Sequence, residues 1–344
     1  MATTSVANTR NTATCVLLLL SFVSYRFTGS SGSYSLFEAV FGTRVAVLLI
    51  GLYCISSIFG ISTIAAGIKQ YITVFNIASI LLIEIIVLAV FCGVNIAGIA
   101  FSGMTENLLT TLKIIPLVVI TILLVPFIRF DHFVQSLSLT ATRLLTTIII
   151  VYWPFTGFEI CAIPVADTKD PALIRRSLLL VILIIVSLYL VLNIALIGSV
   201  GAEVLGASPA PVATAAGTIF THSGAIVASI GIIAMFSAIN AYIIATSQIL
   251  HTLSERFSIP KIRNLSRQGT PVNALVVGCA VSGFLLLVSN RFEALATISV
   301  ITTLVPYIFF CITAWILVAE RKARLVAAPG MLSTTAILFI YFVV

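Results

Sequence analysis

The chain has 344 residues, of which 60% are hydrophobic and only 8% are charged. An average soluble domain carries about 25% charged residues, and a chain this poor in charge cannot cover its own surface in water. These figures exclude a soluble enzyme, a disordered chain and a disulfide-rich secreted module. Because the apolar runs are continuous rather than alternating, they predict an all-α polytopic membrane protein and not a β-barrel.

Ten apolar runs are candidate transmembrane helices, since a helix needs about 20 apolar residues to cross the hydrocarbon core. We predict that the whole chain, residues 1–344, forms one transmembrane domain. Its six cysteines lie in or beside the apolar runs without a CxxC pair, so we interpret them as small buried side chains. In chain order the predicted spans are residues 13–27, 45–68, 77–96, 105–128, 144–166, 177–199, 223–250, 272–289, 294–318 and 327–344.

The net charge of +7 bears on membrane sidedness, because lysine and arginine are enriched in cytoplasmic loops. The loops after the first, third, fifth, seventh and ninth spans hold twelve of the eighteen basic residues, and the opposite side holds five. We therefore predict that these loops are cytoplasmic and that the N-terminus lies outside. On this interpretation the basic loop 256–267 is an orientation signal rather than a nucleic-acid site.

The fourth span carries a lysine at membrane depth, where charged residues are costly and tend to mark function. Lys113 lies three residues before Pro116, and the sequence shows no obvious partner for it. A lysine in this position is paired, is neutral, or performs proton-related or ion-mimicking work. Glu84, in the third span, is better explained by one hydrogen bond to a neighbouring helix.

The fifth span contains two helix-breaking residues, Pro154 and Gly157. They predict an interrupted helix near 153–158, whose freed backbone groups line a cavity instead of facing lipid. Trp153 offers a flat aromatic face to a substrate, and Glu159 adds a carboxyl about one turn beyond the break. The alternative is a kinked structural helix with a hydrogen-bonded glutamate.

Two later spans are rich in polar side chains, which can line a site or simply join helices by hydrogen bonds. In the ninth span several of them follow three- and four-residue steps along one face. The polar residues are Ser237, Asn240, Tyr242, Thr246, Ser247 and Gln248 in the seventh span, and Thr297, Ser299, Thr302 and Thr303 in the ninth.

Motifs of catalysis and metal binding are missing from the sequence. It has no HExxH, no GxxxxGK[ST] and no GxSxG, and its three histidines are scattered. We therefore expect no enzyme activity, no cofactor and no metal.

Several stretches, taken in order, resemble the amino acid–polyamine–organocation (APC) transporters, and among them the basic amino acid and polyamine antiporters such as the arginine/agmatine exchanger. The similarity covers nearly the whole chain, and the ordered set is more specific than any single motif. The matching stretches are Ser31–Tyr34 with Phe41-Gly42, Asn95–Gly98, Leu112–Pro116, Trp153–Glu159 with Lys169–Pro171, Gly269–Pro271 and Ser299–Tyr307.

The resemblance implies an inverted-repeat fold with the substrate at mid-membrane. It implies that Trp153 gates the substrate, that the backbone around Phe155, Thr156 and Gly157 accepts from its ammonium group, and that Glu159 takes part in gating. It also implies an ion-coupling role for Lys113, which resembles a lysine that replaces a sodium ion in some branches of the family. The remaining implied substrate-binding residues are Tyr242, Ser299, Ser56 and Ser57.

Aligned in this way, the first span corresponds to the second helix of the family, and we expect the chain to lack the first and last family helices. The leading hypothesis is a secondary active transporter that moves basic amino acids or their amine products across the cytoplasmic membrane by alternating access. The alternative is a transport-inactive remnant, or a membrane subunit that works only in assembly with another chain. The expected partners are the small-molecule substrate, the lipid bilayer and a second copy in a homodimer, with no nucleic acid.

Overall fold

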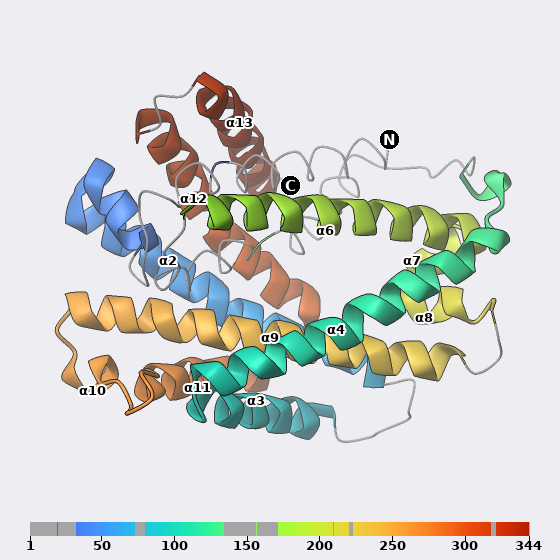
Figure 1. Ribbon diagram of the computed structural model, residues 1–344, viewed down its shortest axis with the longest axis horizontal. Coiled ribbons are helices and arrows are strands. Elements are labelled where there is room, and N and C mark those ends of the chain that lie inside the picture. Colours follow the sequence, from blue (N-terminus) through green and yellow to red (C-terminus); the bar gives the residue numbers. More distant parts are fainter. Residues whose placement is uncertain are drawn as a thin grey trace. The chain divides into compact units, whose positions relative to one another are not determined.

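The computed structural model describes residues 32–72, 80–133, 171–208, 210–219, 223–317 and 321–343, together with Leu19 and Thr156. All regular elements in these residues are helices (Figure 1). The long helices are α2 (Gly32–Ile72), α3 (Ile80–Ile96), α4 (Ile99–Leu124), α6 (Pro171–Val200), α9 (Ser223–Arg256), α11 (Val272–Val288), α12 (Phe292–Leu317) and α13 (Arg321–Val343). The short ones are η2 (Val125–Phe127), η3 (Phe130–Phe133), α7 (Ala202–Ala207), α8 (Pro211–Ala216) and α10 (Pro260–Arg263).

Five of the described helices are long and apolar enough to cross a membrane, namely those within α2, α4, α6, α9 and α12. Three shorter apolar helices lie at residues 80–96, 272–288 and 326–339. This composition confirms the predicted class, an all-α polytopic membrane protein. The predicted spans 13–27 and 144–166 fall outside the described residues apart from Leu19 and Thr156.

The chain divides into two compact units, each built from separate stretches of sequence. Unit 1 comprises residues 1–63, 139–183 and 242–344, and unit 2 comprises residues 64–138 and 184–241. In unit 1, α12 packs against α13 and α10 against α11; in unit 2, α3 packs against α4 and α4 against α8.

Helix α2 contains a break that the sequence did not predict. Gly42 has φ 78° and ψ 169°, so residues 32–41 form a separate helical segment ahead of the long one. This combination of angles is open almost only to glycine. The stretches Ser31–Tyr34 and Phe41-Gly42 resemble a loop of the APC transporters, whereas the structure has helix over residues 32–41, ahead of the break at Gly42.

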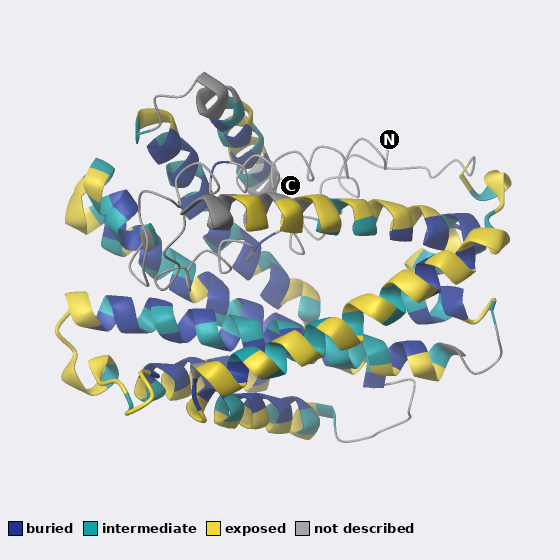
Figure 2. Ribbon diagram, viewed as in Figure 1, coloured by how far each residue is buried: buried dark blue, intermediate teal, exposed yellow. Residues whose placement is uncertain are grey.

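Helix α4 shows how the apolar surface is exposed. Its side chains at three- and four-residue steps are exposed and apolar, and they form one stripe along the helix (Figure 2). An exposed apolar stripe of this kind is unfavourable in water and favourable in the hydrocarbon core of a membrane. It is formed by Leu108, Leu112, Ile115, Val119 and Ile122.

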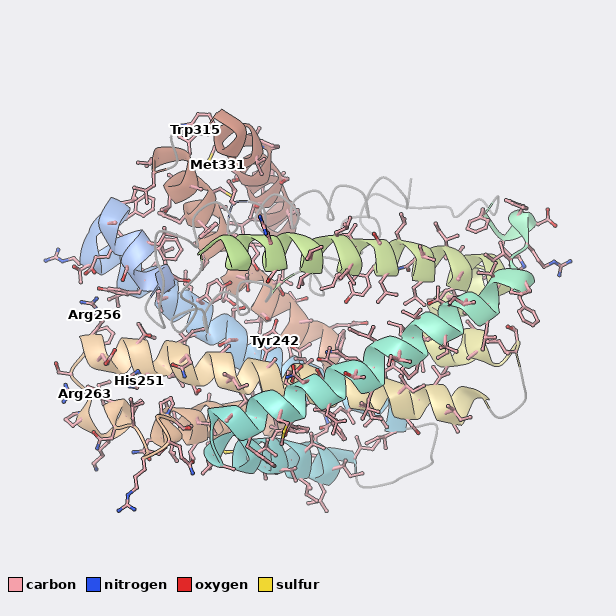
Figure 3. All side chains as sticks on the ribbon, viewed as in Figure 1. Tyr242, His251, Arg256, Arg263, Trp315 and Met331 are labelled. Atoms are coloured by element: carbon pink, nitrogen blue, oxygen red, sulfur yellow. The ribbon has the colours of Figure 1, made fainter. Side chains whose placement is uncertain are left out.

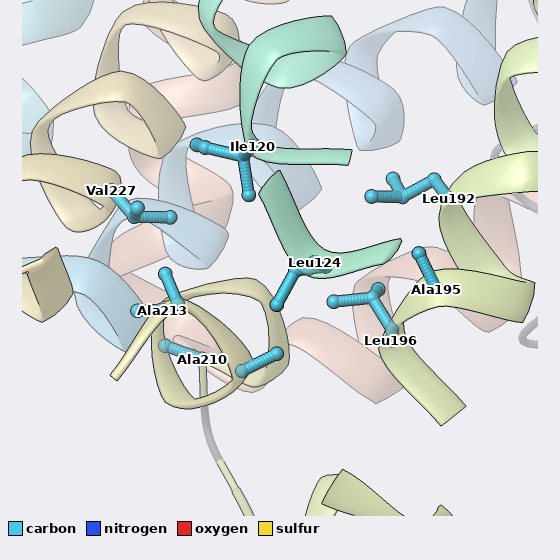
Figure 4. Packing of buried hydrophobic residues seen from close by; sticks show 10 residues of the cluster. Ile120, Leu124, Leu192, Ala195, Leu196, Ala210, Ala213 and Val227 are labelled. Carbon is cyan, nitrogen blue, oxygen red and sulfur yellow. The ribbon is translucent and has the colours of Figure 1, made fainter. Parts of the chain in front are cut away.

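The C-terminal end of α4 is buried in the apolar core of unit 2. Ile120 and Leu124 contact small and medium side chains from three other helices (Figure 4). The small alanines allow these backbones to approach closely, as is common for helices packed in a membrane. The remaining labelled members are Leu192, Ala195 and Leu196 of α6, Ala210 just ahead of α8, Ala213 of α8 and Val227 of α9.

Candidate functional site

Most of the predicted interrupted helix lies outside the described residues. This applies to Trp153, Phe155, Gly157 and Glu159. Thr156 is described and is buried, with 8% of its surface exposed.

A cluster of hydroxyl side chains, which we call the hydroxyl cluster, joins three helices of unit 1. Ser56 Oγ donates to the backbone oxygen of Ser299 at 2.8 Å, and Ser299 Oγ donates to the backbone oxygen of Ser56 at 3.0 Å. Ser56 also contacts the hydroxyl of Thr303, and Thr246 Oγ1 donates to Ser57 Oγ at 3.0 Å. All five residues are buried.

The structure thus brings three predicted substrate-binding residues, Ser56, Ser57 and Ser299, into one cluster. Ser56 and Ser299 donate to each other's backbone oxygens, while Ser57 accepts from Thr246 and donates to the backbone oxygen of Cys54. The reciprocal pair between α2 and α12 is typical of hydrogen bonds that hold membrane helices together. A substrate that uses these hydroxyls has to replace a bond between helices. The cluster can therefore couple ligand binding to the fit of α2 against α12.

The fourth predicted residue, Tyr242, lies against α2 at a glycine. A Cβ atom built on Gly60 would lie 2.5 Å from Cε1 of the Tyr242 ring, so the ring occupies the space that a side chain would fill. Glycine at this position lets α2 and the ring approach closely. The aromatic side chain predicted for this site is therefore packed on the backbone of α2.

The end of α9 forms a charged contact with the first segment of α2. Arg256 lies 3.5 Å from Oε2 of Glu38, and its guanidinium carbon lies 4.3 Å from the centre of the Tyr34 ring. Figure 3 shows Arg256 near His251 and Arg263 at this end of α9. Tyr34 and Thr43 both donate to Oε1 of Glu38, at 2.9 and 3.0 Å.

In unit 2, six polar side chains from α3, α4 and α9 form a hydrogen-bonded group, which we call the Lys113 network. Lys113 Nζ donates to Ser237 Oγ at 2.6 Å, and Ser237 Oγ donates to Oε1 of Glu106. Lys113 Nζ lies 4.0 Å from the same carboxylate oxygen. The members of the network are Asn95, Ser102, Glu106, Lys113, Ser237 and Asn240.

The carboxylate of Glu106 is held by several donors. Thr110 Oγ1 donates to its Oε1 at 3.2 Å, and Asn240 Nδ2 donates to its Oε2 at 3.0 Å. Asn240 is itself fixed, because its Oδ1 accepts from Asn95 Nδ2 at 2.9 Å and from Ser102 Oγ at 3.1 Å. These bonds hold the carboxylate of Glu106 in place beside the ammonium of Lys113.

Lys113 therefore has partners that the sequence analysis did not find. Glu106 precedes it by seven residues, which is two helical turns and the same face of α4; this spacing is the signal that could have identified it. Ser237 and Asn240 are polar residues of the seventh predicted span, but only the fold places Ser237 against Lys113 and Asn240 against Glu106. In the part of the chain that the structure describes, no group of three or more His, Cys, Asp or Glu side chains could hold a metal ion.

Comparison with known proteins identifies the family. The sequence profile of the amino acid permeases matches residues 12–344. The chain belongs to the amino acid permease family. This membership confirms the resemblance to the APC transporters at the level of the family, and it confirms that the chain belongs to a class of transporters and not of enzymes.

Three curated relatives are similar to parts of this permease-family chain. The serine/threonine exchanger SteT of Bacillus subtilis is 24% identical over 255 residues, covering 70% of this chain and 57% of the relative. The inner membrane transport protein YbaT of Escherichia coli is 29% identical, covering 60% and 48%. The aromatic amino acid permease FywP of Lactococcus lactis is 33% identical, covering 40% and 32%. The chain thus spans about half the length, or less, of the curated relatives it matches.

The described members of the predicted site are divided between the two units of this permease-family protein. Ser56, Ser57, Thr156, Tyr242 and Ser299 belong to unit 1. Lys113, with its network, belongs to unit 2. A substrate-binding role for the first group and an ion-coupling role for the second stay predictions.

Proposed function

We propose that this chain acts as a secondary active transporter that moves amino acids across the cytoplasmic membrane by alternating access. The match of the amino acid permease profile to residues 12–344 carries the proposal. Two of the relatives are named for the exchange or permeation of amino acids. A charged network on the face of an otherwise apolar helix is the kind of feature that marks an ion pathway in such proteins.

The substrates that we propose are basic amino acids or their amine products, moved by exchange. This choice follows the motif resemblance, and in particular the stretch Trp153–Glu159, where an aromatic face and a carboxyl suit a cationic substrate. Two relatives are named for other substrates, serine and threonine or aromatic amino acids. These amino acids are the alternative substrate class.

We propose two sets of functional residues in this transporter, one for ion coupling and one for substrate binding. Lys113 acts in ion coupling. The substrate contacts are made by Trp153, Phe155, Thr156, Gly157, Glu159, Tyr242, Ser299, Ser56 and Ser57.

Counterflow into proteoliposomes tests the proposal. Vesicles holding the purified chain are loaded with one unlabelled amino acid and diluted into a trace of the same labelled compound, with protein-free vesicles as the control. We expect saturable accumulation of arginine, lysine, ornithine or agmatine, and weaker accumulation of serine, threonine and phenylalanine. Accumulation of only the neutral group would replace the proposed substrate class and leave the transport function standing.

The same assay separates the proposal from its alternative, a transport-inactive remnant or an assembly-dependent subunit. A folded, monodisperse protein that accumulates none of the labelled compounds would contradict independent transport by this chain. The mass of the protein in that preparation, measured by size-exclusion chromatography, also tests the predicted homodimer.

A further inference from the structure

The Lys113 network contains a second charged residue, Glu106, whose position suggests more than packing. It lies on the same face of α4 as Lys113, and the two side chains are about one quarter exposed, at 25% and 28%. A lone ammonium at this depth is costly, and a carboxylate within about 4 Å reduces that cost. The pair therefore explains how α4 carries a lysine within an apolar helix.

The hydroxyl of Ser237 connects the two charges. It accepts from Lys113 Nζ at 2.6 Å and donates to Oε1 of Glu106, so one oxygen carries both bonds in a consistent direction. A hydroxyl is the one side-chain group that can accept and donate at the same atom without a change of charge. Ser237 is fully buried, which keeps bulk water from replacing it.

We propose that Lys113, Ser237 and Glu106 form one proton-sharing unit, with Ser237 as the relay and Glu106 as the acceptor. The ammonium of Lys113 gives a proton to Ser237 Oγ while Ser237 gives its hydroxyl proton to Glu106 Oε1. The products are a neutral amine and a neutral carboxylic acid, and the net charge of the unit is unchanged. This proposal rests on the proposed transport function for the coupling of the unit to substrate movement.

The buried amides act as positioning residues for the unit. Asn240 and Ser102 are 0% exposed and Asn95 is 3% exposed. Asn240 Nδ2 donates both to Glu106 Oε2 and to the backbone oxygen of Ser102 at 3.3 Å, while its Oδ1 accepts from the other two side chains. With every polar atom of this amide used, the carboxylate of Glu106 is fixed in the orientation that faces Ser237.

Other titratable groups on the surrounding helices of unit 2 are few. Residues 223–241 of α9 contain none. On the other described elements of unit 2 they are Lys69 and Tyr71 of α2, Glu84 and Cys92 of α3, Asp131 and His132 of η3, Tyr189 of α6 and Glu203 of α7, with Arg129 just ahead of η3.

The first test is independent of transport. Thermal melting of the purified full-length chain in detergent is compared for wild type, Lys113→Met, Glu106→Gln and the double variant. Each single substitution leaves one charge without its counter-charge, so we expect both to lower the melting temperature and the double variant to lose clearly less than the sum. Strictly additive losses would overturn the pairing of the two charges.

The second test addresses the relay. Ser237→Ala removes the hydroxyl and Ser237→Thr keeps one, while Ser229→Ala on the same helix removes an exposed hydroxyl that donates to its own helix at Ala225. We expect the initial rate of amino acid exchange in proteoliposomes to fall at least tenfold in Ser237→Ala and to stay within threefold of wild type in the other two. A wild-type rate in Ser237→Ala would overturn the relay.

The two tests fail in distinguishable ways. If wild type shows no uptake at any pH while the melting cycle shows coupling, the proposed transport function fails and the charge pair stands. If wild type exchanges amino acids and Ser237→Ala exchanges them at the wild-type rate, transport stands and the relay is wrong. If Ser237→Ala does not fold, Glu106→Gln replaces it, because it removes the proton acceptor and keeps the hydroxyl.

Discussion

At the scale of single residues, Gly60 decides how closely the ring of Tyr242 approaches α2. A Cβ there would lie 2.5 Å from Cε1 and 3.0 Å from Cδ1 of the ring, which is too close for either atom to stay in place. We predict that Gly60→Ala displaces the ring and lowers the free energy of unfolding by about 1–3 kcal/mol. Thermal melting in detergent measures the loss.

Gly51 provides the matched control on the same helix, because a Cβ built on it meets nothing within 4 Å. We expect Gly51→Ala to leave the melting temperature unchanged or to raise it, since alanine favours a helix by up to about 1 kcal/mol. Equal melting temperatures for Gly60→Ala and wild type would contradict the contact between Gly60 and the Tyr242 ring.

Only some contacts of the Lys113 network could be predicted from the sequence. The depth of Lys113 in an apolar run is visible in the sequence, and so is the two-turn spacing to Glu106. The contact to Ser237 joins residues 124 positions apart, and nothing in the local pattern indicates it. Likewise Ser56 and Ser299, 243 positions apart, were associated only through the family resemblance and not through their own neighbours.

At the scale of the elements, the break in α2 depends on the backbone of Gly42. Its φ of 78° with ψ of 169° is open almost only to glycine, and a Cβ built there meets nothing within 4 Å. The cost of a side chain is therefore one of backbone strain alone. We predict that Gly42→Ala lowers the free energy of unfolding by about 1–3 kcal/mol. Comparing its thermal melting with that of the sterically matched Gly51→Ala isolates the cost of backbone strain. Equal stability of the two variants would show that the break does not need glycine.

The contact between α2 and the end of α9 is a surface interaction. Arg256 and Glu38 have 43% and 32% of their side chains exposed, so solvent screens the pair. We predict that Arg256→Gln lowers stability by no more than about 1 kcal/mol, and that the loss shrinks as salt is raised. Melting at low and high salt checks this, with the exposed loop residue substituted in Arg267→Gln as the control. A large loss that salt does not change would mean that the contact is not a screened ion pair.

The described helices cover most of the predicted spans, because twenty-residue apolar runs are a strong local signal. Their ends are less predictable. Helix α9 continues to Arg256 beyond the predicted end at 250, and α6 begins at Pro171 before the predicted start at 177. The extra turns carry charged and polar residues such as Glu255 and Arg175. Such residues end an apolar run in the sequence, but they do not end a helix.

At the scale of the whole molecule, the orientation of the chain stays a prediction from its charges. Single cysteines introduced by Gln268→Cys, next to the basic loop 256–267, and by Glu293→Cys, in the first turn of α12, test it in a background without native cysteines; both positions are exposed. We expect a membrane-impermeant maleimide to label position 293 in intact cells and position 268 only after permeabilisation. Labelling of position 268 in intact cells would reverse the predicted sidedness.

The class of the molecule could be predicted from composition alone, because a chain with 8% charge has to place most of its surface in lipid. Its division into units could not. Residues 64–138 join residues 184–241, and the intervening stretch belongs to the other unit. Such an interleaved arrangement depends on contacts between distant helices, which periodicity does not record.

We propose that this chain transports amino acids through a site at the predicted interrupted helix. Its two tryptophans allow one direct measurement, the initial rate of amino acid exchange in proteoliposomes for wild type, Trp153→Leu and Trp315→Leu. Trp315 lies exposed on α12, with 46% of its surface accessible (Figure 3), and serves as the matched control. We predict that Trp153→Leu abolishes exchange and that Trp315→Leu exchanges as wild type does. Absence of saturable exchange by folded wild type, or wild-type exchange by Trp153→Leu, would contradict the claim.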